Sequence, residues 1–203
     1  MSDDPIFAVG RPDLLEADLG LRPAMAPKIG ALIIFAANVE FRLERAIWRL
    51  QKHAPSGVRH PTDAKPIGEL IDMFEEEVAK LPESSEKQLA ELWCPTARIA
   101  FDFRHSIAHG AAFRMEGAMS IHRNRSWSGE IRKRPEASLW GDQNTFENIY
   151  LTFALLLRVI NSFSNERRPM DTIGTTVRLK AMRSAKGLMG EMASGHGPWF
   201  EKY

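Results

Sequence analysis

The sequence of 203 residues contains a single cysteine, Cys94. One cysteine excludes an intrachain disulfide bond and a zinc site built from several thiolates. The longest apolar stretches, residues 31–37 and 153–157, are far shorter than the ~20 residues that a membrane-spanning helix needs. The first residues, Met-Ser-Asp-Asp-Pro, are acidic and lack the apolar core of a targeting signal. We therefore expect a cytoplasmic protein that does not enter a membrane.

Internal repeats, low-complexity tracts and a Gly-rich phosphate-binding loop are also missing from the sequence. Its length suits one well-buried core and one domain. The net charge of +1 neither favours nor excludes a nucleic-acid partner, but the charge is unevenly distributed. Residues 1–103 carry 12 Lys and Arg against 17 Asp and Glu, whereas residues 104–203 carry 15 against 9. The basic second half favours an anionic ligand.

Apolar residues recur at three- and four-residue steps in four segments, which predicts four amphipathic helices. These segments are residues 28–53, 66–81, 85–110 and 144–163. Ser85 with Gln88, and Asn144 with Glu147, match the capping-box pattern that marks the start of a helix. Pro95 lies inside the third segment, where it predicts a kink or a restart of the helix, because proline has no backbone N–H to donate.

The remaining segments lack this period. Residues 111–135 alternate loosely and hold Gly117 and Gly129 at turn-like positions, which predicts a small β-hairpin. Residues 1–27 contain four prolines and are interpreted as an N-terminal arm, and residues 166–203 as a partly helical C-terminal extension. The expected fold is all-α: an up-and-down bundle of four to five helices over residues 28–165, with a hairpin insertion at about 111–135.

The third predicted helix ends in Arg104-His105-Ser106-Ile107-Ala108-His109-Gly110. At 100° per residue, a polar row falls on the side opposite the apolar residues of this helix. The row consists of Glu91, Arg98, Asp102, His105 and His109, with Arg104 on its flank. Two readings stay open: a functional site with histidines, an arginine and an acid, or a solvated face held by local pairs such as Arg98–Asp102.

Arg104, four intervening residues and then His109 with Gly110 resemble the Arg-x4–6-His motif of the HEPN superfamily (higher eukaryotes and prokaryotes nucleotide-binding domain). Many members carry a polar residue directly after the arginine, as His105 does here. The context is similar too, because a long first helix containing Glu40 and Glu44 precedes a helix that ends in the motif. The resemblance covers roughly residues 28–165.

The resemblance implies a metal-independent endoribonuclease without a cofactor, often a toxin of a toxin–antitoxin system or a phage-defence component. It implies a homodimer in which two motifs form one cleft, with RNA as the substrate and an antitoxin protein as a further partner. His109 would be the general acid/base, Arg104 the phosphate-stabilising cation and His105 an auxiliary polar group. We expect Asp102 and Arg98 to support them. The alternative is a catalytically silent HEPN-like module that binds RNA, a nucleotide or a protein partner.

Two competing sites are less well supported by the sequence. His105 and His109, four residues apart, match half of a zinc site, but a His-Glu-x-x-His enzyme needs glutamate where Ser106 stands. No third ligand is obvious, so we expect no metal. A lone cysteine such as Cys94, between Trp93 and Pro95, is more often buried than nucleophilic.

The hairpin segment is strongly basic and contains one tryptophan. Such a pattern suits contact with an RNA backbone and stacking on a base. The residues predicted to bind RNA are Arg123, Arg125, Trp127, Arg132, Lys133 and Arg134. The alternative is an exposed loop that its charges keep soluble.

Overall fold

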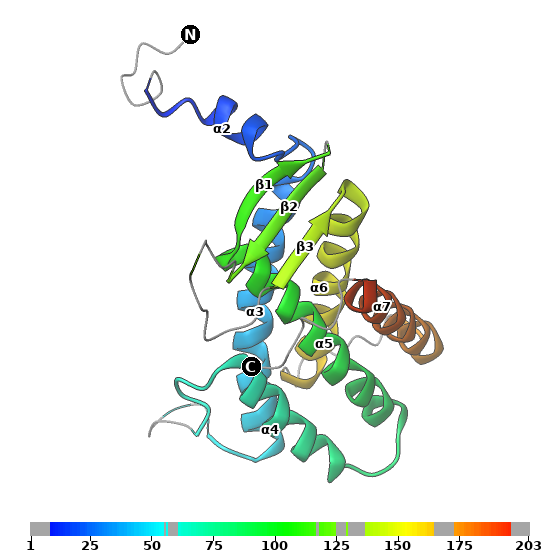
Figure 1. The fold of residues 1–203 in the computed structure, drawn as a ribbon. Helices are drawn as coiled ribbons and strands as arrows, with labels where there is room; N and C mark the ends of the chain where they lie inside the picture. Colours follow the sequence, from blue (N-terminus) through cyan, green and yellow to red (C-terminus); the bar gives the residue numbers. More distant parts are fainter. Residues whose placement is uncertain are drawn as a thin grey trace.

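The computed structural model describes residues 9–54, 56, 61–116, 118–124, 129, 137–164 and 173–195. This part of the chain is mainly helical, with a small antiparallel sheet over one end of the helices (Figure 1). The prediction of a mainly helical fold with a small β element is thus confirmed. The elements are α2 (Pro12–Asp18), α3 (Ala26–Leu50), α4 (Ile67–Ala79), α5 (Ser85–His109), β1 (Ala111–Met115), β2 (Ala118–Arg123), β3 (Ala137–Gly141), α6 (Gln143–Ser164) and α7 (Thr175–Gly195).

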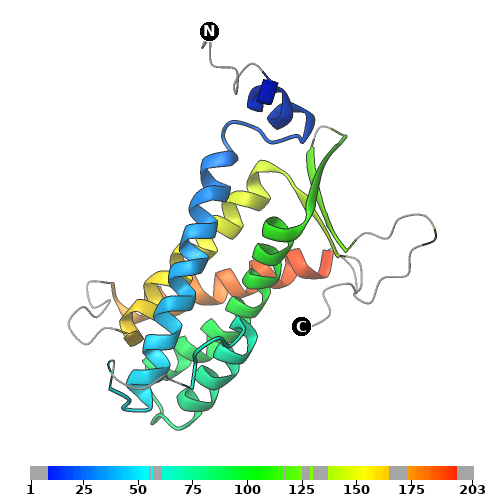
Figure 2. The same ribbon diagram turned by 90° about the vertical axis from the view of Figure 1, so that its left-hand side faces the viewer.

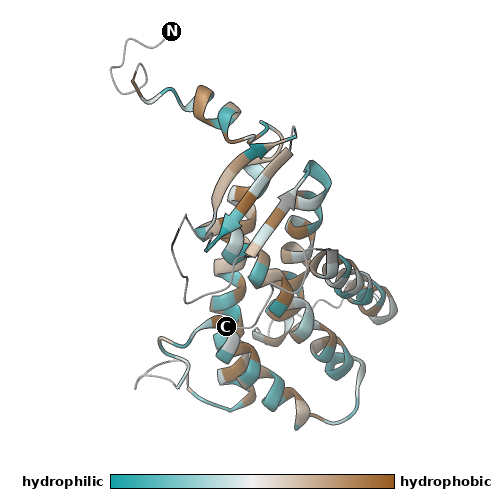
Figure 3. Ribbon diagram, viewed as in Figure 1, coloured by the Kyte–Doolittle hydropathy of each residue, from teal (hydrophilic) through white to brown (hydrophobic). Residues whose placement is uncertain are grey.

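The core forms where α3 lies along α6 and where α5 packs against α4 and α7. Polar and apolar residues alternate along these helices, as amphipathic segments require (Figure 3). The largest fully buried side chain, Trp93 of α5, contacts Phe74 of α4 edge-on, with ring centroids 5.6 Å apart. The indole N–H of Trp93 donates to the backbone carbonyl of Leu156 on α6 at 3.0 Å. This buried polar group is therefore satisfied and ties α5 to both neighbours.

Helix α5 is one continuous helix with Pro95 inside it, so of the two predicted outcomes, a kink or a restart, the restart does not occur. The predicted capping box at Ser85 and Gln88 is wrong by one residue. Ser84 is the N-cap: its backbone is extended and its hydroxyl accepts the N–H of Lys87 at 3.1 Å. Only Ser85 has a Gln or Glu three residues later, but either serine can cap a helix, and the backbone conformation decides which one does.

The start of α6 also differs from the prediction. The carboxylate of Asp142, not Asn144, caps this helix, because its Oδ1 accepts the backbone N–H of Thr145 at 2.7 Å and its hydroxyl at 2.8 Å. Glu147, the predicted capping partner, instead forms an ion pair with Lys28 of α3. That pair links the N-terminal ends of the two most closely packed helices.

The predicted hairpin is two strands of a three-stranded antiparallel sheet in the order β1-β2-β3. The third strand lies beyond the predicted insertion, and its five residues show too little alternation to be recognised. One face of the sheet joins the helical core, because Met119, Ile121 and Leu139 are at most 3% exposed. Gly141 ends β3 where the ring of Phe146 occupies the space that a side chain would need.

The segments before and after the predicted bundle contain helices as well. The N-terminal arm holds α2, which buries none of its residues and projects away from the body (Figure 1). The predicted C-terminal extension holds α7, which crosses the bundle and packs against α5 (Figure 2). Met182 and Met189 of α7 are fully buried, so this helix belongs to the same core.

Candidate functional site

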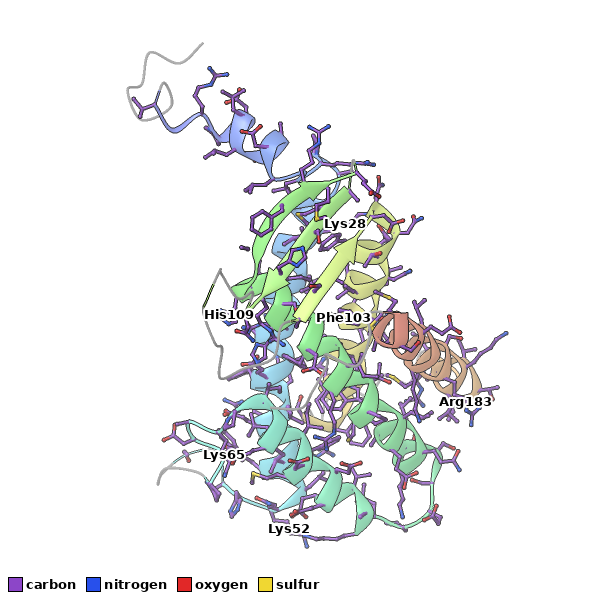
Figure 4. All side chains as sticks on the ribbon, in the orientation of Figure 1. Lys28, Lys52, Lys65, Phe103, His109 and Arg183 are labelled. Atoms are coloured by element: carbon purple, nitrogen blue, oxygen red, sulfur yellow. The ribbon has the colours of Figure 1, made fainter. Side chains whose placement is uncertain are left out.

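The Arg-x4-His segment forms the last turns of α5, where the predicted helix end at Gly110 is confirmed. The backbone N–H of Gly110 donates to the carbonyl of Ser106 at 2.8 Å and closes the final turn. Phe103 and Ser106 face the core and are fully buried, whereas His109 is exposed. Figure 4 labels His109 at this end of the helix, beside the sheet. His109 therefore lies on the solvent-facing side of α5, away from the side that Phe103 and Ser106 bury.

Three motif residues lie together at this end of α5. Arg104 Nη1 is 3.4 Å from His105 Nδ1, and the rings of His105 and His109 are 5.7 Å apart between centroids. Arginine can only donate, so Nδ1 of His105 is the acceptor and the neutral ring carries its proton on Nε2. Burial lowers the pKa of His105, and the charges of Arg104, Arg123 and His109 lower it further. These effects favour a neutral His105 whose Nδ1 accepts a hydrogen bond from Arg104.

Arg104 is half-buried between α5 and α3. Its Nε is buried and has no hydrogen-bond partner among the described residues. Glu40 of α3 lies beside it: burial raises the pKa of Glu40, the positive charge of Arg104 lowers it, and Glu44 raises it. A phosphate oxygen that reached the Nε donor would satisfy it, since a guanidinium binds two oxygens at once.

A second pair of opposite charges, Asp102 and Arg123, borders the motif. Burial raises the pKa of Asp102 to about 6, although the charge of Arg123 acts in the opposite direction. Arg123 is only 9% exposed. The sequence indicated an exposed basic hairpin, whereas the structure turns Arg123 inward toward α5. The other predicted RNA-binding residues, Arg125, Trp127, Arg132, Lys133 and Arg134, lie outside the described residues.

Arg98 does not join this cluster. Its guanidinium forms ion pairs with Asp72 at 2.6 Å and Glu75 at 2.7 Å, both on α4. The predicted local pair between Arg98 and Asp102 is therefore wrong, because Arg98 joins α5 to α4 instead. Arg98 supports the position of α5 rather than the chemistry at its end.

The competing chemistries find little support. Within the described ranges, no group of three or more His, Cys, Asp or Glu is placed to hold a metal ion. Cys94 is fully buried, and burial raises the pKa of its thiol to about 12, so the thiolate that a nucleophile needs does not form near neutral pH.

None of the helices that the structure describes is long and apolar enough to span a membrane.

The face of the sheet opposite Met119 and Ile121 holds a polar network that the sequence did not indicate. The ring of His122 lies between two hydroxyls, with Ser120 Oγ 2.8 Å from Nε2 and Ser138 Oγ 2.9 Å from Nδ1. The alternation of Ser120 and His122 along β2 was a visible signal, but the contribution of Ser138 depends on the pairing with β3. A cavity of about 420 Å³ between α2 and β1 is lined by none of the motif residues.

Comparison with protein-family models finds no match, and comparisons with curated proteins and with solved structures find none either. The resemblance to the HEPN superfamily therefore rests on the motif and on its position at the end of α5. It remains a prediction.

Proposed function

We propose that this protein is a metal-independent endoribonuclease of the HEPN type, built as a HEPN-like bundle. The observation that carries the proposal is the meeting of Arg104, His105 and His109 at the solvent-facing end of α5. Arg104 holds a buried donor that no described residue satisfies, and His109 is exposed. A half-buried cation and an exposed imidazole therefore lie together in the last two turns of α5.

The roles follow from the chemistry of each group. Arg104 binds the non-bridging oxygens of the phosphate and stabilises the charge that builds up on them. His109 transfers a proton to or from the reacting oxygens, because an exposed imidazole can both accept and donate a proton. His105 stays neutral and orients Arg104 through Nδ1. Attack of the 2′-hydroxyl on the adjacent phosphate then leaves a 2′,3′-cyclic phosphate and a free 5′-hydroxyl.

This reaction uses both a base and an acid, whereas one subunit offers one exposed histidine of the motif. We propose that two subunits pair about a two-fold axis and bring their motifs into one cleft. In this account the protein is a toxin or phage-defence component that acts on RNA, with an antitoxin protein as its partner. The cytoplasmic location that the sequence favours stays a prediction.

A second candidate is a catalytically silent module that binds RNA, a nucleotide or a protein. The carboxylate of Glu40 beside Arg104 favours it, because that negative charge opposes an incoming phosphate. The two candidates differ in one outcome. A silent module binds RNA without cutting it.

The test is incubation of the protein with total RNA and transfer RNA in the presence of EDTA. We expect fragments with 2′,3′-cyclic phosphate ends, no cleavage at sites that carry 2′-deoxyribose, and none by Arg104→Ala. Cleavage that stops with EDTA and returns with zinc would contradict the proposal and favour a metal site at His105 and His109. Binding without cleavage would favour the silent module.

A further inference from the structure

Arg123, the last residue of strand β2, lies near the end of α5. Side chains alternate along a strand, so Arg123 shares a face with Met119 and Ile121, and that face is buried against the helices. β2 is the middle strand and is paired on both sides, with Arg123 opposite Ala137 of β3. A one-residue slip would turn Arg123 outward, and two pairings hold the register against it.

The contact between α5 and β2 is unusually close at Gly110. A Cβ atom there would lie 2.3 Å from Cγ2 of Ile121 and 3.3 Å from the backbone oxygen of His122, the residue before Arg123. Only a residue without a side chain lets the strand approach so near. The glycine that ends the motif thereby fixes where Arg123 enters the site.

A buried guanidinium is costly unless charged or polar groups surround it. On α5, Asp102 and His105 face Arg123: its positive charge lowers the pKa of both groups, alongside the larger effect of burial on each. Arg104 and His109 of the same helix also act on His105.

From α3, Glu40 faces Arg104, and Glu44 acts on Glu40. Opposite charges thus border the motif on two sides. Arg104 and Glu40 lie toward α3, and Arg123 and Asp102 lie toward the sheet.

We infer that Arg123 is a positioning residue of this site, which holds Asp102 as a carboxylate and His105 as a neutral ring. A neutral His105 keeps Nδ1 available as the acceptor for Arg104, so the guanidinium that binds phosphate keeps its orientation. The effect on cleavage rests on the proposed ribonuclease function, but the electrostatic effect does not. In this inference the small sheet contributes a residue, Arg123 of β2, to the site.

A purely structural role for Arg123 makes a different prediction. A residue that only packs the sheet against α5 would change the stability of the fold and leave the titration of its neighbours in place. The decisive measurement is therefore an NMR pH titration of the Asp102 carboxyl and the His105 ring. It is made on the wild-type protein, Arg123→Gln, Arg123→Lys and the matched control Arg114→Gln, an exposed arginine on β1 of the same sheet.

In Arg123→Gln, we expect the midpoint of Asp102 to rise by about one pH unit from its value near 6, as loss of a nearby opposite charge commonly produces. The midpoint of His105 rises as well, because a positive neighbour has been removed. Arg114→Gln leaves both midpoints unchanged. Arg123→Lys keeps the positive charge, so its two midpoints stay close to those of the wild type. In each variant, the pH at which the cleavage rate falls on the acid side should shift together with these midpoints.

Unchanged midpoints in a folded Arg123→Gln would overturn the inference. Should that variant not fold, Arg123→Lys decides, and displaced midpoints in it would show that charge is not what Arg123 supplies. The proposed function is judged separately. If the midpoints move but RNA is not cleaved, Arg123 keeps its positioning role and the proposed ribonuclease function is wrong. If RNA is cleaved and the pH profile of cleavage is the same in all variants, the ribonuclease function stands and the positioning role of Arg123 is wrong.

Discussion

The structure predicts that Gly110→Ala lowers the stability of the fold, because the added Cβ would clash with its neighbours. Gly110 has φ −87° and ψ 156°, a conformation that any residue adopts, so the backbone itself is not strained by alanine. The cost comes from space. The new Cβ would lie 2.3 Å from Ile121 Cγ2 and 2.5 Å from the carbonyl oxygen of Ser106. Ordinary contacts of this kind are 3.4–4 Å.

Neither neighbour can withdraw freely. The Ser106 carbonyl accepts the Gly110 N–H at 2.8 Å and would lose that bond by moving. Ile121 is buried in the middle strand of the sheet, 3% exposed. Overpacking of this kind costs about 1–3 kcal/mol. For a chain of this size, each kcal/mol lowers the Tm by about 2–4 °C, so the expected drop is roughly 2–12 °C.

The assay is thermal unfolding followed by circular dichroism, with Gly30→Ala as the matched control. Gly30 lies in α3, and a Cβ there would meet nothing within 4 Å. Alanine should therefore stabilise that helix by up to about 1 kcal/mol. A Gly110→Ala protein that melts at or above the wild-type temperature would refute the close contact between α5 and β2, and with it the placement of Arg123.

Three further predictions follow from the same structure. Asp102 has a folded pKa near 6, above its ordinary value of 3.8, so its contribution to stability is full below about pH 4 and is lost as the pH rises through 6. Asp102→Asn should flatten the pH dependence of urea unfolding in that window, and an unchanged slope would contradict this. Cys94, with a thiol pKa near 12 instead of 9, should react with a disulfide reagent roughly a thousandfold more slowly in the folded than in the urea-unfolded protein; equal rates would show an accessible thiol. Light scattering should give the mass of a dimer. A strictly monomeric mass at high micromolar concentration would contradict the proposal that two subunits bring their motifs into one cleft.

The helices were predictable because their signal is local. Periodic apolar residues placed α3, α4, α5 and α6 to within three residues at each end. The end of α5 at Gly110 followed from the same pattern. This helix end is what made the short motif recognisable, since it predicted that the arginine and the histidines would meet there.

What the sequence did not provide depends on contacts between distant segments. β3 is five residues long, and it forms a strand because β2 supplies its partners. The inward direction of Arg123 depends on the register of β2 with both neighbours. Arg98 matched Asp102 at four-residue spacing but pairs with Asp72 and Glu75, which only the packing of α4 on α5 brings near.

In the proposed mechanism, His109 transfers a proton during RNA cleavage. Its most direct test is the rate of cleavage of one defined RNA in EDTA by His109→Ala, beside the matched variant His53→Ala, which removes an exposed histidine outside the motif. We expect His109→Ala to lose activity on the order of a hundredfold or more, as for a general acid/base, with unchanged helical circular dichroism. His53→Ala should cleave at the wild-type rate. Cleavage by His109→Ala at the wild-type rate would show that His109 is not the general acid/base and that this motif does not carry the reaction.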